Sequence, residues 1–74
     1  MTEHPYPATR WRHFKGGTYR VIGLTEHSET GECLVAYLDE KSGKIWVRPL
    51  TMWSEMVEAG GTMVPRFTCL GYTP

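Results

Sequence analysis

Short runs of alternating hydrophobic and polar residues follow one another along the chain and predict β-strands. In the run 18–24, Tyr19 and Val21 would share one face of a strand and Ile22 would lie on the other, because successive strand side chains alternate between faces. The run 33–38 is apolar on both faces, which is typical of a central strand. We therefore predict two strands, the second of them inside a sheet.

A polar segment over residues 39–44 separates the run 33–38 from a further apolar run, 45–48. Two apolar runs joined by a short polar segment predict a β-hairpin. Pro49 follows directly and is expected to end the second strand, because proline cannot donate a hydrogen bond to the ladder. The predicted hairpin therefore spans residues 33–48.

The last third of the chain predicts a helical turn and three more strands. Residues 50–54 follow a proline and are too few for a stable helix, so one turn of 3₁₀ or α-helix is expected. The runs 56–58 and 62–64 flank Gly60-Gly61, which predicts a second hairpin. The run 66–70 is expected to form the final strand.

Five or six short strands, separated by turns every 8 to 12 residues or so, predict an all-β fold. In a chain of 74 residues we predict a small SH3-like barrel, a curved antiparallel sheet with one helical turn before the last strands. The alternative is an open, curved antiparallel sheet that dimerises. We expect a flexible arm over residues 1–9, one domain over residues 10–70 and a tail over residues 71–74.

Composition narrows the classes of partner. The chain has 8 basic and 8 acidic residues, so its net charge of zero disfavours a general binder of nucleic acid. No apolar run approaches the roughly 18 residues of a membrane helix, and the start does not have the pattern of a secretory signal. We therefore expect a cytoplasmic protein that binds no membrane.

Several strings of aromatic, charged and proline residues form a distinctive set in a fixed order. They are Arg12-His13-Phe14-Lys15-Gly16, His27-Ser28-Glu29-Thr30, Trp46-Val47-Arg48-Pro49-Leu50 and Val64-Pro65-Arg66-Phe67, with Tyr19, Tyr37, Met52, Glu55 and Val57 between them. Over about residues 10–69 the chain resembles the domain of unknown function 1653, a family of short bacterial and phage-encoded proteins. The resemblance implies a compact β-rich fold and supplies no established activity, so the function is argued from the residues.

Trp46 and Arg48 would point to the same face of their strand, with Ile45 and Val47 on the core side. An indole beside a guanidinium suits a planar, anionic ligand, because the ring stacks and the guanidinium donates forked hydrogen bonds. Tyr37 is expected to stack as well. The alternative is that Trp46 covers the mouth of the barrel while Arg48 pairs with a glutamate.

The loop string from His27 to Thr30 offers a second set of polar groups. His27, Glu29 and Thr30 could read the polar edges of a ligand, and Glu29 could instead fix Arg48 or Arg12. The alternative is a hairpin turn whose hydroxyl groups satisfy local backbone groups. As acid and base, His27 and Glu29 would make the protein an enzyme acting on a small substrate.

Basic and aromatic residues alternate over residues 10–15, a pattern seen in single-strand nucleic-acid platforms. Residues 1–25 carry a net charge of +3 and residues 26–74 carry −3. This asymmetry suffices for one or two phosphates, which Arg12 could contact, but not for a long backbone. The alternative places Trp11 and Phe14 in the core or at the end of the barrel.

We predict a non-catalytic module that binds a small planar anionic ligand, a nucleotide-derived molecule, and that could sequester a nucleotide signal. The alternatives are an SH3-like module for a peptide or nucleic acid and the small-substrate enzyme. No catalytic motif, metal-ligand spacing or cofactor signature is present. More large aromatic side chains occur than so small a core can bury, so we expect a homo-oligomer. The predicted ligand-binding residues are Arg12, His27, Glu29, Thr30, Tyr37, Trp46 and Arg48.

Overall fold

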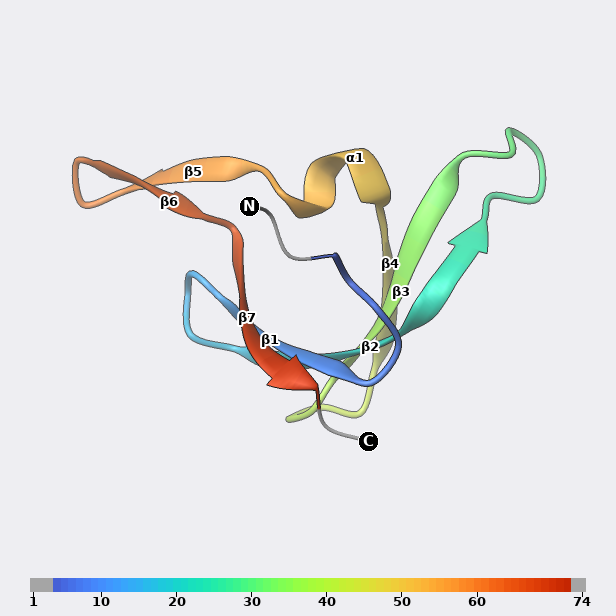
Figure 1. Ribbon diagram of the computed structural model, residues 1–74, viewed down its shortest axis with the longest axis horizontal. Coiled ribbons are helices and arrows are strands. Elements are labelled where there is room, and N and C mark those ends of the chain that lie inside the picture. The colour runs from blue at the N-terminus through green and yellow to red at the C-terminus, as the bar shows by residue number, and fades with distance from the viewer. Residues whose placement is uncertain (1–3, 73–74) are drawn as a thin grey trace.

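The computed structural model describes residues 4–72, and these form seven β-strands and one short helix (Figure 1). The elements, in chain order, are β1 (Thr9–His13), β2 (Thr18–Glu26), β3 (Cys33–Asp39), β4 (Ile45–Pro49), α1 (Leu50–Trp53), β5 (Met56–Ala59), β6 (Thr62–Pro65) and β7 (Phe67–Tyr72). The predicted all-β class with a single helical turn is confirmed. None of the helical structure in residues 4–72 has the length and hydropathy that crossing a membrane requires.

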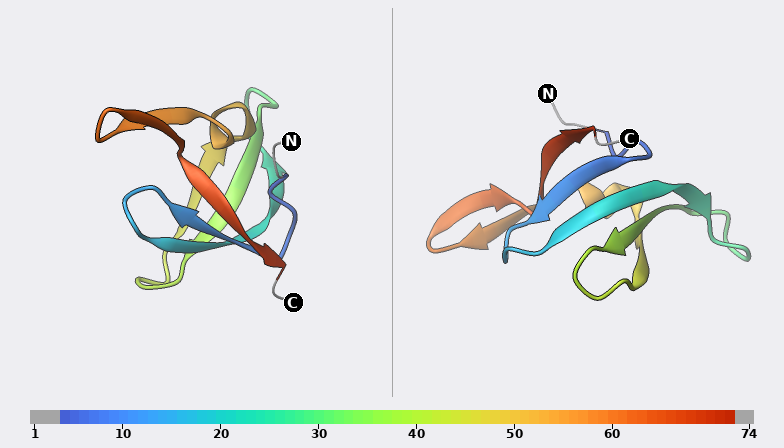
Figure 2. Two further views of the ribbon diagram at one scale, coloured as in Figure 1. Left: turned by 60° about the vertical axis from the view of Figure 1, so that its left-hand side comes forward. Right: turned by 90° about the horizontal axis from the view of Figure 1, so that it is seen from below.

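Five strands form one antiparallel sheet in the order β4-β3-β2-β1-β7, and β5 pairs with β6 in a separate hairpin. The two outer strands, β4 and β7, are not paired with each other, so the sheet is curved and open rather than a closed barrel (Figure 2). The open sheet that was the alternative prediction therefore describes the architecture better. Figure 1 shows the β5–β6 hairpin extending away from this sheet.

Strand β1 was not among the predicted strands. Its alternation of basic and aromatic residues resembled a ligand platform, but Trp11 pairs with Tyr19 on β2 and with Cys69 on β7. Only 3% of Trp11 is exposed, and its indole nitrogen donates to the Thr9 hydroxyl at 2.8 Å. The alternative interpretation, in which Trp11 belongs to the core, is confirmed.

The core lies on the concave face of the sheet and is covered by α1. The Trp53 ring, 1% exposed, stacks on the Phe67 ring with a centroid separation of 4.0 Å. Trp11 meets Trp53 edge to face at 5.5 Å. A four-residue helix is stable here because its Trp53 is buried against the sheet, not because of its own propensity. The buried residues of this core are Trp11, Val21, Val35, Tyr37, Trp53 and Phe67.

The opposite, convex face of β4 is apolar and open to solvent. Ile45 is 63% exposed and Val47 is 57% exposed, so the prediction that they face the core is wrong. The register explains the error: Trp46 lies opposite the buried Tyr37, which places Trp46 on the concave face and its two neighbours on the other. An apolar strand at the edge of a sheet can thus present apolar side chains on a face that nothing in residues 4–72 covers.

Residues before β1 dock on the sheet. Pro5 is buried, and the amide of Ala8 donates to the carbonyl of Val21 at 2.9 Å. The Thr9 hydroxyl donates to the Tyr6 carbonyl at 2.6 Å. Residues 1–3 of the predicted arm and residues 73–74 of the predicted tail lie outside the described residues, and Tyr72 is part of β7.

Candidate functional site

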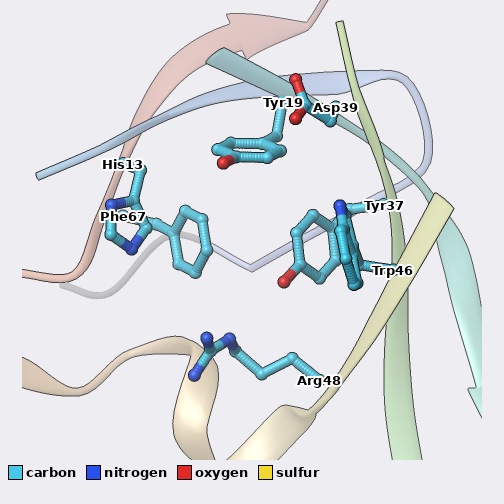
Figure 3. A pocket seen from close by; sticks show the side chains of 7 residues that line it. All are labelled: His13, Tyr19, Tyr37, Asp39, Trp46, Arg48 and Phe67. Carbon is cyan, nitrogen blue, oxygen red and sulfur yellow. The ribbon is translucent and has the colours of Figure 1, made fainter. Parts of the chain in front are cut away.

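A pocket of about 310 Å³ opens on the concave face of the sheet, beside the core (Figure 3). Strands β1, β2, β3, β4 and β7 each contribute at least one side chain to it. The lining residues are His13, Tyr19, Tyr37, Asp39, Trp46, Arg48 and Phe67.

Strand register explains why these side chains meet. Cross-strand partners point to the same face of a sheet, and Tyr37 lies opposite Trp46 while Tyr19 lies opposite Asp39. His13 lies opposite Phe67 in the β1–β7 pair. The alternation of side chains thus directs all of these groups into one concavity.

Aromatic rings form the walls of the pocket. Tyr37 meets Tyr19 at a centroid distance of 5.4 Å and Phe67 at 5.8 Å, both edge to face. Edge-to-face pairs of this kind stabilise a fixed arrangement of rings. Trp46 stands beside Tyr37 on the outer strand and is 48% exposed (Figure 3). The pocket therefore has a rigid aromatic interior and an indole at its open side.

Arg48 supplies the positive charge inside the pocket. Its guanidinium reaches beneath Phe67, 5.9 Å from the ring centroid (Figure 3). The Nε atom is buried and has no hydrogen-bond partner within the described residues. Salt bridges in residues 4–72 join Arg10 and Arg20 to Glu40 and Arg66 to Glu55, and none of them includes Arg48.

The alternative in which Arg48 pairs with a glutamate therefore does not apply within residues 4–72. A partly buried cation without a counter-ion is costly to the folded state, because burial weakens its solvation. An anionic ligand would offset this cost. The pocket end at Arg48 is thus suited chemically to an anion.

His13 lies at the same side of the pocket as the Arg48 guanidinium (Figure 3). Its Nδ1 atom accepts a hydrogen bond from the Lys15 amide at 3.2 Å, which leaves the proton of the neutral ring on Nε2. Burial lowers the pKa of His13, and the positive charges of Arg66, Arg48 and Lys15 lower it further. His13 is consequently neutral near pH 7 in the ligand-free protein.

Asp39 lies at the other side of the pocket, beyond Tyr19 (Figure 3). Its Oδ1 atom accepts hydrogen bonds from the amides of Lys41 at 2.9 Å and Ser42 at 3.4 Å. The Lys41 bond is the main cause of a lowered Asp39 pKa, so the carboxylate stays ionised. Burial and this carboxylate together raise the pKa of Tyr19. The pocket is therefore polarised, with the Arg48 guanidinium at one side and the Asp39 carboxylate at the other.

Three predicted site residues, Tyr37, Trp46 and Arg48, are brought together in the pocket. The predicted site did not include His13, Tyr19, Asp39 or Phe67. Alternation held a signal for three of them: His13 is two residues after the buried Trp11, Tyr19 is two residues before the buried Val21, and Asp39 is two residues after Tyr37. No local pattern indicated Phe67, because only the β1–β7 pairing brings it opposite His13.

The loop residues His27, Glu29 and Thr30 do not reach the pocket. They connect β2 and β3 at the end where Glu26 pairs with Cys33, whereas the pocket lies at the end where Tyr19 pairs with Asp39.

The His27 ring and the Thr30 hydroxyl are engaged within the loop itself. The His27 Nδ1 atom accepts from the amides of Glu29 at 3.2 Å and Thr30 at 3.4 Å, and the Thr30 hydroxyl accepts from the Glu32 amide at 3.2 Å. The alternative interpretation, a turn that satisfies its own backbone, matches this geometry.

Arg12 also lies apart from the pocket. It is exposed and pairs with Thr18 and Thr68, so alternation places it on the face opposite Trp11 and His13. Within residues 4–72 no group of three His, Cys, Asp or Glu side chains is arranged to hold a metal ion.

Comparison with known proteins gives a family without an assigned activity. Residues 9–69 match the family model described as "Protein of unknown function (DUF1653)". A crystal structure of a protein of this family from Bordetella bronchiseptica is similar to this chain, with a TM-score of 0.81 and 30% sequence identity. The alignment covers 93% of this chain and 92% of that chain. No curated protein matches the sequence.

Proposed function

Because the chain belongs to the DUF1653 family, whose description carries no activity, we propose a function from the pocket itself. The protein is a non-catalytic module that binds a small planar anionic ligand, namely a nucleotide-derived molecule. By holding such a molecule in stoichiometric amounts it would sequester a nucleotide signal. The observation that carries the proposal is an arginine without a carboxylate partner among residues 4–72, inside a pocket walled by aromatic rings.

The shape and chemistry of the pocket support a small planar ligand. A volume of about 310 Å³ lies at the lower end of the range of small-molecule sites. Trp46 presents a ring surface for stacking, the buried Tyr37 forms the wall beside it, and Arg48 presents N–H donors for a phosphate or carboxylate. A ligand with a flat ring and an attached anionic group combines both requirements.

Binding without turnover is supported by the placement of the titratable groups. His27 and Glu29, the predicted acid and base, lie in the exposed β2–β3 loop at the far end of the ladder. Inside the pocket, the Oδ1 atom of Asp39 already accepts two backbone hydrogen bonds. His13 and Asp39 lie on different sides of Tyr19 and do not form an acid–base pair (Figure 3).

The edge strand β4 supports association with a second copy of the chain, which we include in the proposal. It lies at the end of the sheet and carries exposed Ile45 and Val47. An antiparallel pair of β4 strands centred on Val47 would be symmetric and would place Trp46 opposite Arg48 of the partner subunit. We expect Val47→Lys to convert a dimer to a monomer in sedimentation velocity, whereas a wild-type monomer would contradict this part of the proposal.

Native mass spectrometry of the purified protein, followed by denaturation, tests the binding function. One bound molecule per site, released chemically unaltered and with the ultraviolet absorbance of an aromatic ring, would support the proposed binding function. Titrations with adenosine 5′-monophosphate and with adenosine, monitored by tryptophan fluorescence, then measure how much the phosphate group contributes to the binding affinity. Product beyond one equivalent would indicate an enzyme, and affinity that rises with oligonucleotide length and falls steeply with salt would indicate a nucleic-acid binder.

A further inference from the structure

We propose that the side of the pocket between His13 and Arg48 holds an oxyanion, and that His13 takes up a proton from solvent when this oxyanion binds. The inference rests on the proposed function, because it concerns the same pocket. It adds the position of the anionic group of the ligand and a dependence of binding on pH.

Arg48, which lines this side of the pocket, has a buried donor without an acceptor in residues 4–72. The Nε atoms of Arg48 and Arg66 are both buried and have no hydrogen-bond partner in the described residues. The Trp53 indole nitrogen is a third such donor, but neither Trp53 nor Arg66 lines the pocket, so Arg48 is the donor that the argument uses. Groups that only donate are satisfied by a ligand that only accepts, which is the character of a phosphate or sulfate group.

Positive charge converges on His13 from several elements. Arg48 approaches from β4, Arg66 from the corner between β6 and β7, and Lys15 from the β1–β2 turn, and each of them disfavours a proton on the imidazole. One carboxylate moderates this field: Glu55 accepts from the Nη2 atom of Arg66 at 3.3 Å. The ligand-free protein therefore concentrates cations here and leaves His13 uncharged.

The remaining groups around His13 do not replace an anion. Tyr19, Phe14 and Phe67 contact it as rings, and burial raises the pKa of the Tyr19 hydroxyl, so that group stays neutral. Asp39, the carboxylate of the pocket, lies beyond Tyr19 on the other side and is held by its own turn (Figure 3).

An oxyanion reverses the balance at His13. Two negative charges beside Arg48 and His13 would offset the cations that disfavour imidazolium and would attract the new proton directly. His13 already has Nε2–H, so the proton is added to Nδ1, which then releases the amide of Lys15. Proton uptake and anion binding are linked reciprocally, so the anion binds more tightly as pH falls through the titration of His13.

Sulfate is a suitable probe, because it remains a dianion between pH 5 and pH 8 or so and any pH dependence then comes from the protein. We would titrate the three histidines of the wild-type protein by NMR from their imidazole resonances, with sodium sulfate and with sodium chloride at equal ionic strength. We expect sulfate to raise the pKa of His13 by about one unit, which corresponds to about tenfold tighter binding of sulfate at low pH. His27, in the distant loop, is the internal control and should not move.

Two variants separate the proposal from a general salt effect. Arg48→Ala should abolish the sulfate-dependent shift at His13, and Arg12→Ala, on the opposite face, should keep it. A His13 resonance that titrates identically in sulfate and chloride would overturn the inference, as would an equal shift at His27.

The outcome is distinguishable from that of the proposed function. Sulfate could raise the pKa of His13 although neither adenosine 5′-monophosphate nor any molecule released from the purified protein binds. In that case the oxyanion site is supported and the planar-ligand function is contradicted. If a nucleotide binds in the pocket without a change at His13, the function stands and this inference fails.

Discussion

The pocket and the β2–β3 loop, toward opposite ends of the β2–β3 ladder, both carry side chains that could contact a ligand, but in different states. At one end, Arg48 and the rings of Tyr37 and Trp46 line a pocket, and the guanidinium has no carboxylate partner within residues 4–72. At the other end, His27 and Thr30 accept hydrogen bonds from amides of their own loop.

The difference shows which property marks a candidate site. Histidine and threonine are chemically capable ligand contacts, but a polar group that is already satisfied within the loop, as His27 Nδ1 and the Thr30 hydroxyl are, has little to gain from a ligand. An unpaired, partly buried donor gains the full benefit of a new acceptor. The two regions therefore differ less in residue type than in whether each polar group already has a hydrogen-bond partner within the protein.

Arg48→Ala should produce the largest effect on binding. Loss of a hydrogen bond between charged groups costs about 1.5–3 kcal/mol, so affinity for adenosine 5′-monophosphate should fall by about 10- to 150-fold in a fluorescence titration. Stability should change by less than about 1 kcal/mol, because the wild-type guanidinium has no ion pair in residues 4–72 to lose.

Arg12→Ala is the matched control, since it removes the same side chain from the exposed opposite face. Equal losses of affinity in the two variants would show that Arg48 in the pocket contributes no more to binding than Arg12 on the surface. Unfolding of Arg48→Ala would instead assign Arg48 to the core.

Trp46→Ala should weaken binding by the loss of stacking, about 1–3 kcal/mol or roughly 5- to 150-fold, in isothermal titration calorimetry. Trp46→Phe should retain part of the affinity that stacking contributes, because phenylalanine keeps an aromatic ring at this position. Ile45→Ala, on the same strand and the opposite face, is the control and should leave affinity unchanged. If Trp46→Ala binds as the wild type does, the indole is not part of the site.

His13 should make the domain less stable in acid. Its folded-state pKa lies below the ordinary value of 6.5, so the unfolded chain binds more protons and stability falls as pH drops below about 6.5. In the variant His13→Asn, the asparagine can accept the hydrogen bond from the Lys15 amide but does not titrate. The free energy of unfolding, measured by urea denaturation between about pH 5 and pH 7.5, should therefore depend less on pH than in the wild type. An unchanged profile would show that His13 is not responsible.

His27→Ala should have the smallest effect on binding, less than about twofold. It should lower stability by about 0.5–1.5 kcal/mol, because the amides of Glu29 and Thr30 lose their acceptor. Thermal denaturation and the same fluorescence titration measure both quantities. A loss of affinity comparable with that of Arg48→Ala would show that the loop takes part in ligand binding.

Much of the local structure was predictable because it depends on local physics. Alternation and turn residues located β2, β3, β4, the β5–β6 hairpin and the helical turn within a few residues. The juxtaposition of Trp46 and Arg48 was also predictable, because both follow from the period of one strand. Strand β1 was missed because over Arg10 to His13 the arginines lie on one face and the aromatic rings on the other, a pattern that a strand and a ligand platform share.

The sequence by itself determined the strands other than β1, their turns and the residues that share a face, since these depend on neighbours two or four positions apart. Only the tertiary structure decided that β4 is an edge strand, that Phe67 meets His13, and that the β2–β3 loop lies away from the pocket. These facts depend on which distant strands pair and in what register, and they decide whether a charge such as that of Arg48 finds a partner. Pairing between strands far apart in sequence is set by the packing of the whole core, for which no short stretch of sequence contains the information.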